Sequence, residues 1–431
     1  MRSANLSVAS PRAPLRPRSV SCLLVLAFLA PWRVLAEPAP TPPTSSRSDD
    51  VAALREWRET TGRLQAAIDR EQSANGPRSR ALIDLYMSLG LSQQEYGEHP
   101  AAAEAFQHAL EVKRANDGLY NLDQAPMLGR LQASEAARGN SAAAGLLEMT
   151  LLRLAKANPL DPRSVPIWRE SGDRQLAAYE RYLAGDRPPP TLSINISGPM
   201  GTGAVGDGVP PNGGGSLWMA RGAYSQAIRN ILRRGDYADE ELPELEGDLI
   251  RTYYLEAERI RDGGNGNPVG LFVRGAQSYE RLATYVRLNG GTALEYATAL
   301  VGLADWQLMF AHNGEAIEQY DAAYQLLVEA GASKAVIREL FPPDRPVLLP
   351  AFQPSPFESD GSLAGAGYVD LAFEITKYGV GRRVRVTGSS NSGDGVEKDA
   401  VSVVARNRFR PQPTASDAHE AIYRVRYHAA P

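Results

Sequence analysis

The feature that most constrains this chain is one spacing of small and aromatic residues that occurs in two distant places. The two sets are Gly90, Ala102, Phe106 and Ala109, and Ala304, Ala316, Tyr320 and Ala323. In both sets the second small residue follows the first by twelve positions, and the last three members stand at helical spacing. Small residues let two antiparallel helices approach closely, and the aromatic ring fills the space between them. The spacing therefore predicts two closely packed helical hairpins.

Helical periodicity extends well beyond these two sets. Apolar residues recur three and four positions apart over residues 49–183 and again over 217–340, which is typical of amphipathic helices. A third, weaker hairpin is expected over 127–137 and 142–158. The order of small and large positions matches the tetratricopeptide repeat (TPR), in which neighbouring hairpins stack to bury a continuous core. Two unrelated alanine-rich hairpins are the alternative interpretation.

The run Ala109–Pro126 resembles a segment of secreted proteobacterial TPR proteins, in which a similar loop joins adjacent hairpins. The sequence Asn-Asp-Gly at 116–118 predicts the end of a helix, and we expect Leu119, Tyr120 and Leu122 to pack back on that helix. The resemblance covers roughly residues 78–160. It implies a fold and no activity.

The first 36 residues have the layout of a secretory signal peptide. Four arginines and no acidic residue precede the short apolar run Val20–Ala30, and small residues end at Ala36. The run is shorter than the ~20 residues that cross a bilayer. We expect cleavage after Ala36 and a periplasmic or secreted chain that does not span the membrane; an uncleaved anchor is the alternative. The single cysteine, Cys22, lies in this segment.

Composition and periodicity divide the chain into seven segments. They are a signal peptide 1–36, a flexible leader 37–48, a TPR-like helical block 49–185, a Gly/Pro-rich insert 186–216, a second TPR-like block 217–341, a linker 342–366 and a C-terminal domain 367–431. Within the insert, Gly201–Gly206 fits the G-x-G-x-x-G pattern of dinucleotide sites. Glycines and prolines follow it immediately, so no helix begins there to bind a phosphate, and we expect no cofactor. A short strand is expected at 192–196.

After Pro342 the hydrophobic pattern changes from helical to alternating. The expected elements are a strand over 367–376 with Val369, Leu371, Phe373 and Ile375 on one face, a turn at 378–381, a strand over 383–387 with Val384 and Val386 inward, a helix over 396–407 and a strand over 421–427. Period-two alternation is typical of half-buried strands. The sequence thus predicts a small α+β domain with the order β-β-α-β.

This domain resembles the TonB C-terminal domain. The matching residues are Gly367, Phe373, Gly379, Ser389, Ser390, Asp399, Ala400, Arg408, Phe409, Pro411, Val425, Arg426 and Tyr427. The resemblance implies a sheet whose edge pairs with an extended peptide of an outer-membrane partner. The chain departs from the family in two places: the N-terminal segment contains no histidine, and residues 355–362 replace the helix that normally precedes the first strand. These departures argue against a membrane-tethered energy transducer.

Charge is divided between the parts of the chain. Residues 37–366 carry 31 Lys/Arg against 43 Asp/Glu, and residues 367–431 carry 10 against 7. Four arginines, Arg383, Arg385, Arg424 and Arg426, are expected to form a basic surface on neighbouring strands. Solvated outward positions of an alternating sheet explain them most simply. Docking to an acidic partner, including the protein's own helical region, is the alternative.

The sequence contains no pattern typical of catalysis or metal binding. Nucleophile, zinc-protease and phosphate-loop motifs are absent from the sequence, as are paired cysteines. An acidic, exported chain also argues against nucleic acid as a partner. We therefore expect a multidomain, non-enzymatic cell-envelope scaffold or adaptor, in which TPR-like repeats and a TonB-like sheet bind a protein or peptide. The alternative is a TonB-type energy transducer anchored by its N-terminal segment.

Overall fold

The computed structural model describes residues 47–185, 214–261, 263–264, 266–343, 346–350, 367–390, 394–413 and 418–427. The predicted signal peptide, most of the leader, most of the linker, the G-x-G-x-x-G string and the short strand at 192–196 lie outside these residues. Among the described helices none is long and apolar enough to cross a membrane.

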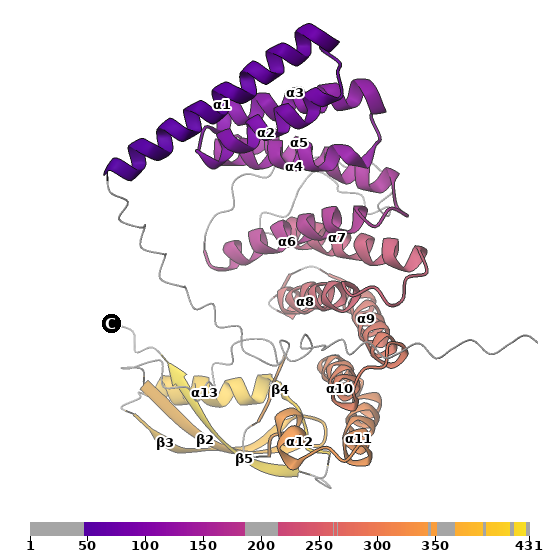
Figure 1. Ribbon diagram of the computed structural model, residues 1–431. Helices are drawn as coiled ribbons and strands as arrows, with labels where there is room; N and C mark the ends of the chain where they lie inside the picture. The colour runs from indigo at the N-terminus through magenta and orange to yellow at the C-terminus, as the bar shows by residue number, and fades with distance from the viewer. Residues whose placement is uncertain are drawn as a thin grey trace, which may run out of the picture.

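Up to residue 340 the described chain is helical. The helices are α1 (Arg47–Asn75), α2 (Ala81–Glu95), α3 (His99–Asp117), α4 (Ala125–Ala137), α5 (Ser141–Ala157), α6 (Ser164–Leu183), α7 (Gly214–Arg233), α8 (Leu242–Arg261), α9 (Pro268–Leu288), α10 (Ala293–Met309), α11 (Asn313–Glu329) and α12 (Lys334–Leu340). Successive helices from α1 to α11 pack against each other, and Figure 1 shows them stacked along one curved column.

Local sequence sets where these helices begin and end. Asn140 accepts a hydrogen bond from the Ala143 amide at the start of α5, and Thr292 with Glu295 forms a capping box at the start of α10. Gly139, with a φ of 76°, turns the chain between α4 and α5 in a backbone conformation that favours glycine. The weaker hairpin expected over 127–158 is therefore present as α4 and α5.

Helix α6, before the predicted insert, packs directly against α7, which follows it. One apolar cluster contains Trp168 and Tyr179 from α6, Tyr224 and Ile231 from α7, and extends to Trp306 in α10. The two predicted helical blocks therefore share a core across the insert, and α6 and α7 form a hairpin of the same stack.

The C-terminal residues form an antiparallel sheet of order β3-β2-β5. Its elements are β2 (Gly367–Thr376), β3 (Gly381–Ser389), α13 (Asp394–Arg406) and β5 (Ala418–Tyr427), in the β-β-α-β order that was predicted. The alternating face of β2 is 0 to 1% exposed and packs with Ala400 and Val404 of α13. Val384 joins this core, but Val386, expected to point inward, is 38% exposed on edge strand β3. The pairing of β2 with β3 shifts register at two places, which breaks strict alternation.

A second, two-stranded sheet was not predicted. Strand β1 (Leu348–Leu349) pairs antiparallel with β4 (Arg408–Phe409), which follows α13. Strand β1 follows the helical column in sequence, and Phe409 packs with Phe373 in the core of the larger sheet. This small sheet therefore joins the end of the column to the C-terminal domain (Figure 1).

Candidate functional site

The first predicted set of repeat positions comes together in the α2–α3 hairpin. Gly90 is buried, and Ala102, Phe106 and Ala109 are each 0% exposed. A Cβ atom on Gly90 would lie 2.6 Å from the Phe106 ring, closer than two carbons approach. The absence of a side chain at Gly90 is thus what lets the two helices pack at this distance.

The second predicted set comes together in the α10–α11 hairpin. Ala304, Ala316 and Ala323 are 0% exposed, and Tyr320 is 1% exposed. All four belong to one apolar cluster at the end of the column.

A third set was missed from the sequence. Gly172 in α6 faces Tyr224 in α7, and a Cβ on Gly172 would lie 2.6 Å from that ring. Tyr224 stands four residues after Ala220 and three before Ala227, the same spacing as in the two predicted sets. The insert separates Gly172 from Ala220, so the twelve-residue offset fails here. The spacing within α7 alone is the signal that identifies this hairpin.

Two of these hairpins also share a polar feature, which we call the Asp–Tyr pair. The hydroxyl of Tyr320 donates a hydrogen bond to Asp305 Oδ1 over 2.7 Å. The hydroxyl of Tyr224 donates to Asp173 Oδ1 over 2.8 Å. In each pair the aspartate directly follows the small residue that its helix places against the aromatic ring.

In the α10–α11 hairpin the Asp–Tyr pair binds an arginine of the C-terminal domain. Arg410 Nε lies 3.0 Å from Asp305 Oδ1 and Nη2 lies 2.6 Å from Oδ2, a bidentate contact. Arg410 Nη1 also donates to the Leu340 carbonyl over 2.7 Å. Both charged side chains are only 5% exposed. Burial opposes the charged guanidinium, but the carboxylate of Asp305 outweighs it and raises the pKa of Arg410.

The turn between β2 and β3 makes a second contact with α10. Gly379 has a φ of 69°, and a Cβ there would lie 2.3 Å from the Phe409 carbonyl oxygen and 2.7 Å from Leu308. No other residue type fits this turn without displacing α10 or β4. The C-terminal domain is therefore held on α10 by both apolar and ionic contacts.

In the α6–α7 hairpin the equivalent carboxylate is open to solvent. Asp173 is exposed, and Asp248 from α8 lies close enough for the two charges to interact. Burial, followed by the charge of Asp173, raises the pKa of Asp248 to about 6. Arg169 forms an ion pair with Glu244 and has Asp173 and Asp248 in its electrostatic surroundings.

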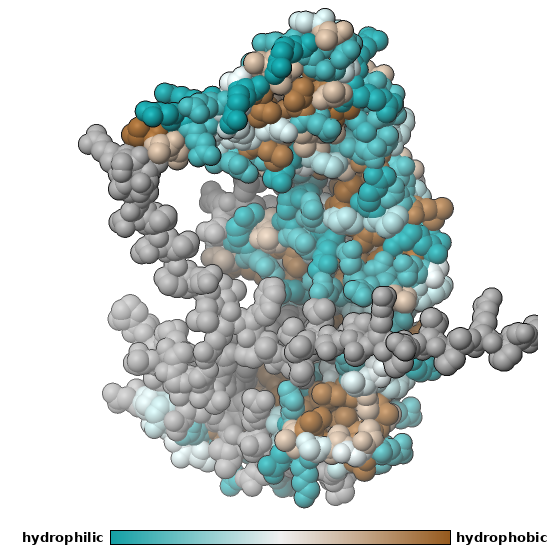
Figure 2. Space-filling model, in the orientation of Figure 1, coloured by the Kyte–Doolittle hydropathy of each residue, from teal (hydrophilic) through white to brown (hydrophobic). Residues whose placement is uncertain are grey.

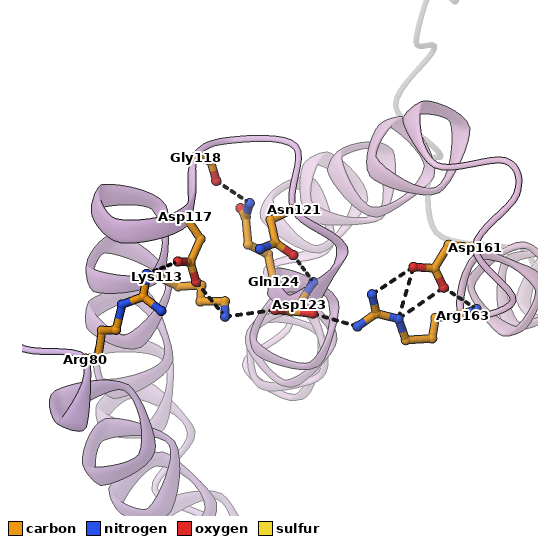
Figure 3. Close-up of polar contacts among 9 residues, drawn as sticks. All are labelled: Arg80, Lys113, Asp117, Gly118, Asn121, Asp123, Gln124, Asp161 and Arg163. Carbon is orange, nitrogen blue, oxygen red and sulfur yellow. Dashed lines mark hydrogen bonds and ion pairs between the residues drawn. The ribbon is translucent and has the colours of Figure 1, made fainter.

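Figure 3 shows a network of ion pairs at the loops of the first hairpins. Its members, in order, are Arg80, Asp117, Lys113, Asp123, Arg163 and Asp161, joined over 2.7, 2.7, 3.1, 2.6 and 2.8 Å. It links the starts of α2 and α6 with the end of α3 and the turn before α4. Hydrogen bonds from Arg163 and Lys113 lower the pKa of Asp123, and Arg163 lowers that of Asp161.

The loop within this network belongs to the run Ala109–Pro126, which resembles secreted TPR proteins. Leu122 is 3% exposed, as expected, but Leu119 and Tyr120 are 65% and 71% exposed, so the prediction that they pack back on the helix was wrong. The Tyr120 carbonyl accepts a hydrogen bond from Asn158 instead, and Asn121 accepts one from the Asp123 amide. The bond from Asn158 connects the loop to the end of α5 in the following hairpin. Cations and carboxylates of the network satisfy each other, which marks it as structural.

The four arginines expected to bind a partner lie on two strands separated by β2. Arg383 pairs with Glu374 over 2.8 Å, and with Arg385 it borders a shallow hollow on β3. The register places Arg424 opposite Asp370 and Arg426 opposite Tyr368 on β5. The arginines therefore lie on two strands that are not adjacent, with β2 between them, and Glu374 of β2 is the acidic partner of Arg383.

The described residues contain no group of three or more His, Cys, Asp or Glu side chains that could hold a metal ion. Their surface is mixed, and the face of the column seen in Figure 2 is mostly hydrophilic with smaller hydrophobic areas between the polar ones. What the described residues provide is the surface of the helical column and that of the C-terminal sheet.

No protein-family profile and no curated protein matches the chain. Among solved structures, the crystal structure of BtubC (BKLC) from P. vanneervenii is similar over 72% of this chain and 98% of that chain, with 13% sequence identity and a TM-score of 0.34.

Proposed function

We propose that this protein is a non-catalytic scaffold or adaptor of the cell envelope that binds protein or peptide partners. The observation that carries the proposal is the buried Arg410–Asp305 contact, which attaches the C-terminal sheet to a long helical column. A protein built in this way presents two binding surfaces in a fixed relation to each other.

The helical column supports a TPR-like assignment. Glycine lies against an aromatic ring in α2–α3 and α6–α7, and Ala304 shares a buried cluster with Tyr320 in α10–α11. In all three hairpins the aromatic is flanked by alanines at one fixed spacing. Stacked hairpins of this kind bury one face and offer the other to a partner. A protein or peptide is the class of ligand that such an extended surface fits.

The C-terminal sheet supports a TonB-like assignment with an edge for peptide addition. Strands β3 and β5 each pair with β2 alone in the described sheet. An extended peptide binds such an edge through its main chain. The predicted signal peptide is the reason for placing the protein in the envelope.

Cross-linking of the full chain in its native cells, followed by affinity capture from the envelope fraction, tests this proposal. We expect a specific partner whose capture is lost on Arg383→Glu with Arg385→Glu, because both residues lie on edge strand β3 and line its hollow. Lys398→Glu, an exposed reversal on α13, is the matched control. A capture pattern that matches mock cells overturns the proposal. Sequencing of the mature N-terminus is the companion measurement: Glu37 as first residue supports the scaffold, and retention of residues 1–36 favours an anchored transducer.

A further inference from the structure

The two Asp–Tyr pairs differ in what lies against them. At Asp305–Tyr320 the carboxylate is occupied by Arg410 and buried, with the aspartate 3% exposed. At Asp173–Tyr224 the same hydrogen bond is formed, but the carboxylate faces solvent. The same molecule thus contains one Asp–Tyr pair with a guanidinium bound to its carboxylate and one without (the open pair, Asp173–Tyr224).

The occupied pair shows how the ligand is presented. Arg410 follows the short strand β4, whose Phe409 is 0% exposed, and precedes Pro411. The Arg410 amide donates to the Val347 carbonyl over 2.8 Å, so the backbone is held extended by β1. The aspartate then binds the guanidinium through both oxygens. A tyrosine that already donates to one oxygen fixes the carboxylate in the orientation that a bidentate contact needs.

The open pair has the same parts and an additional acidic side chain. Among the described residues Asp173 accepts its hydrogen bond from Tyr224, and Asp248 makes none. Arg169 is engaged by Glu244 and Glu241 on α8 and its preceding loop. Arg251, the second cation near Asp248, pairs with Glu180 over 2.6 Å. Both cations thus form their ion pairs with other carboxylates, and those of Asp173 and Asp248 remain for a positively charged ligand.

We propose that the Asp173–Tyr224 pair, with Asp248 beside it, binds the arginine side chain of an extended peptide from a partner protein. The chain contains an internal copy of this site, at which its own Phe-Arg-Pro segment makes the same contact. A guanidinium fits better than an ammonium, because its planar donors match both oxygens of a carboxylate. This inference rests on the proposed function and specifies the chemistry of the partner.

Fluorescence anisotropy with a labelled, capped peptide of residues 409–413 tests the site on the full-length protein. That peptide carries the single arginine of the internal ligand. We expect saturable binding that weakens about tenfold or more in Asp173→Asn, since a charge-assisted hydrogen bond is lost. Asp84→Asn, which removes an exposed carboxylate from α2, is the matched control and should bind as the unaltered protein does. A peptide with lysine in place of the arginine should bind more weakly.

Two results would overturn the inference. One is equal affinity of the unaltered protein and Asp173→Asn; the other is no saturable binding at peptide concentrations up to about 1 mM. Affinity capture with Asp173→Asn separates this inference from the proposed function. If the variant captures the same partner as the unaltered chain, the assignment of the site fails and the scaffold stands; if neither captures a partner, the scaffold fails.

Discussion

The α6–α7 and α10–α11 hairpins contain the same small residue, aromatic ring and Asp–Tyr pair, yet one carboxylate is exposed and the other is among the most buried in the described residues. The difference arises from what covers them. The C-terminal domain lies on α10 and supplies Arg410 to Asp305. Among the described residues no arginine forms an ion pair with Asp173, because nearby Arg169 pairs with Glu244 and Glu241. The local pattern thus determines the Asp–Tyr hydrogen bond in both hairpins. Whether the carboxylate is also paired with a cation depends on a distant part of the chain.

The largest change in stability should come from removing the arginine that covers Asp305. Arg410→Leu leaves a buried carboxylate without its counter-ion, and we expect a loss of about 3 to 5 kcal/mol in the free energy of unfolding. Chemical denaturation measures it. Arg383→Leu is the control, because that ion pair is exposed and should matter by less than about 1 kcal/mol. Similar losses in the two variants would contradict the assigned role of Arg410.

The next largest effect should come from forcing helices apart in a hairpin. Gly172→Leu and Gly90→Leu place side chains where the Tyr224 and Phe106 rings already lie, at a cost of about 1 to 3 kcal/mol or more. Gly129→Leu in α4 is the matched control, since a Cβ there meets no atom within 4 Å. Thermal melts that are unchanged for both buried glycines would refute the close packing of these hairpins.

The stability of the α6–α7 hairpin, where Asp173 is exposed, should depend on pH because of Asp248. An unfolded aspartate loses its proton near pH 4, while burial and Asp173 raise the pKa of Asp248 to about 6. The folded protein therefore binds more protons between these values, and its stability falls as the pH rises through this window. Asp248→Asn should stabilise the protein at pH 7, by up to about 3 kcal/mol, and leave it unchanged near pH 4.

Melting curves of this variant across pH 4 to 8 measure the effect. The charged groups that surround Asp248 are Asp173, Arg169, Glu244 and Arg251. Asp84→Asn serves as a control because that carboxylate is exposed. A gain that is the same at both ends of the range would show that Asp248 does not titrate in this window.

The smallest loss of stability should come from removing the tyrosine hydroxyl of each Asp–Tyr pair. Tyr320→Phe removes a hydrogen bond from buried Asp305 and should cost about 1 to 2 kcal/mol, whereas Tyr224→Phe should cost about 0.5 to 1 kcal/mol because water replaces its bond to exposed Asp173. Urea denaturation of the two variants side by side measures the difference. Equal costs would mean that the covering domain does not change the value of this bond.

Much of the architecture could be predicted from local pattern. Alternation over 367–376 predicted β2 with its bounds, and the small and aromatic positions of α2–α3 and α10–α11 are buried together. These features depend on neighbours in sequence, where periodicity carries the information. The exposed Tyr120 shows the limit, because its backbone bond to Asn158 comes from the following hairpin.

The candidate site could not be predicted in the same way. Arg410 and Asp305 are 105 residues apart, and no spacing rule connects them. The α6–α7 hairpin was hidden because the insert changes the offset between its two halves, although the spacing around Tyr224 was present in the sequence. Arg410 lies between Phe409 and Pro411 in the run that resembles the TonB domain, but that resemblance assigns it no contact with the helical column.

The pairing of β1 with β4 has a mechanical consequence. Strand β1 follows the helical column, and β4 lies between α13 and β5. Force applied to the C-terminal strand therefore reaches α10 through the β1–β4 hydrogen bonds and the Arg410 guanidinium, in parallel with the covalent chain. The helical column would bear such a load at its last hairpin as a shear across Asp305.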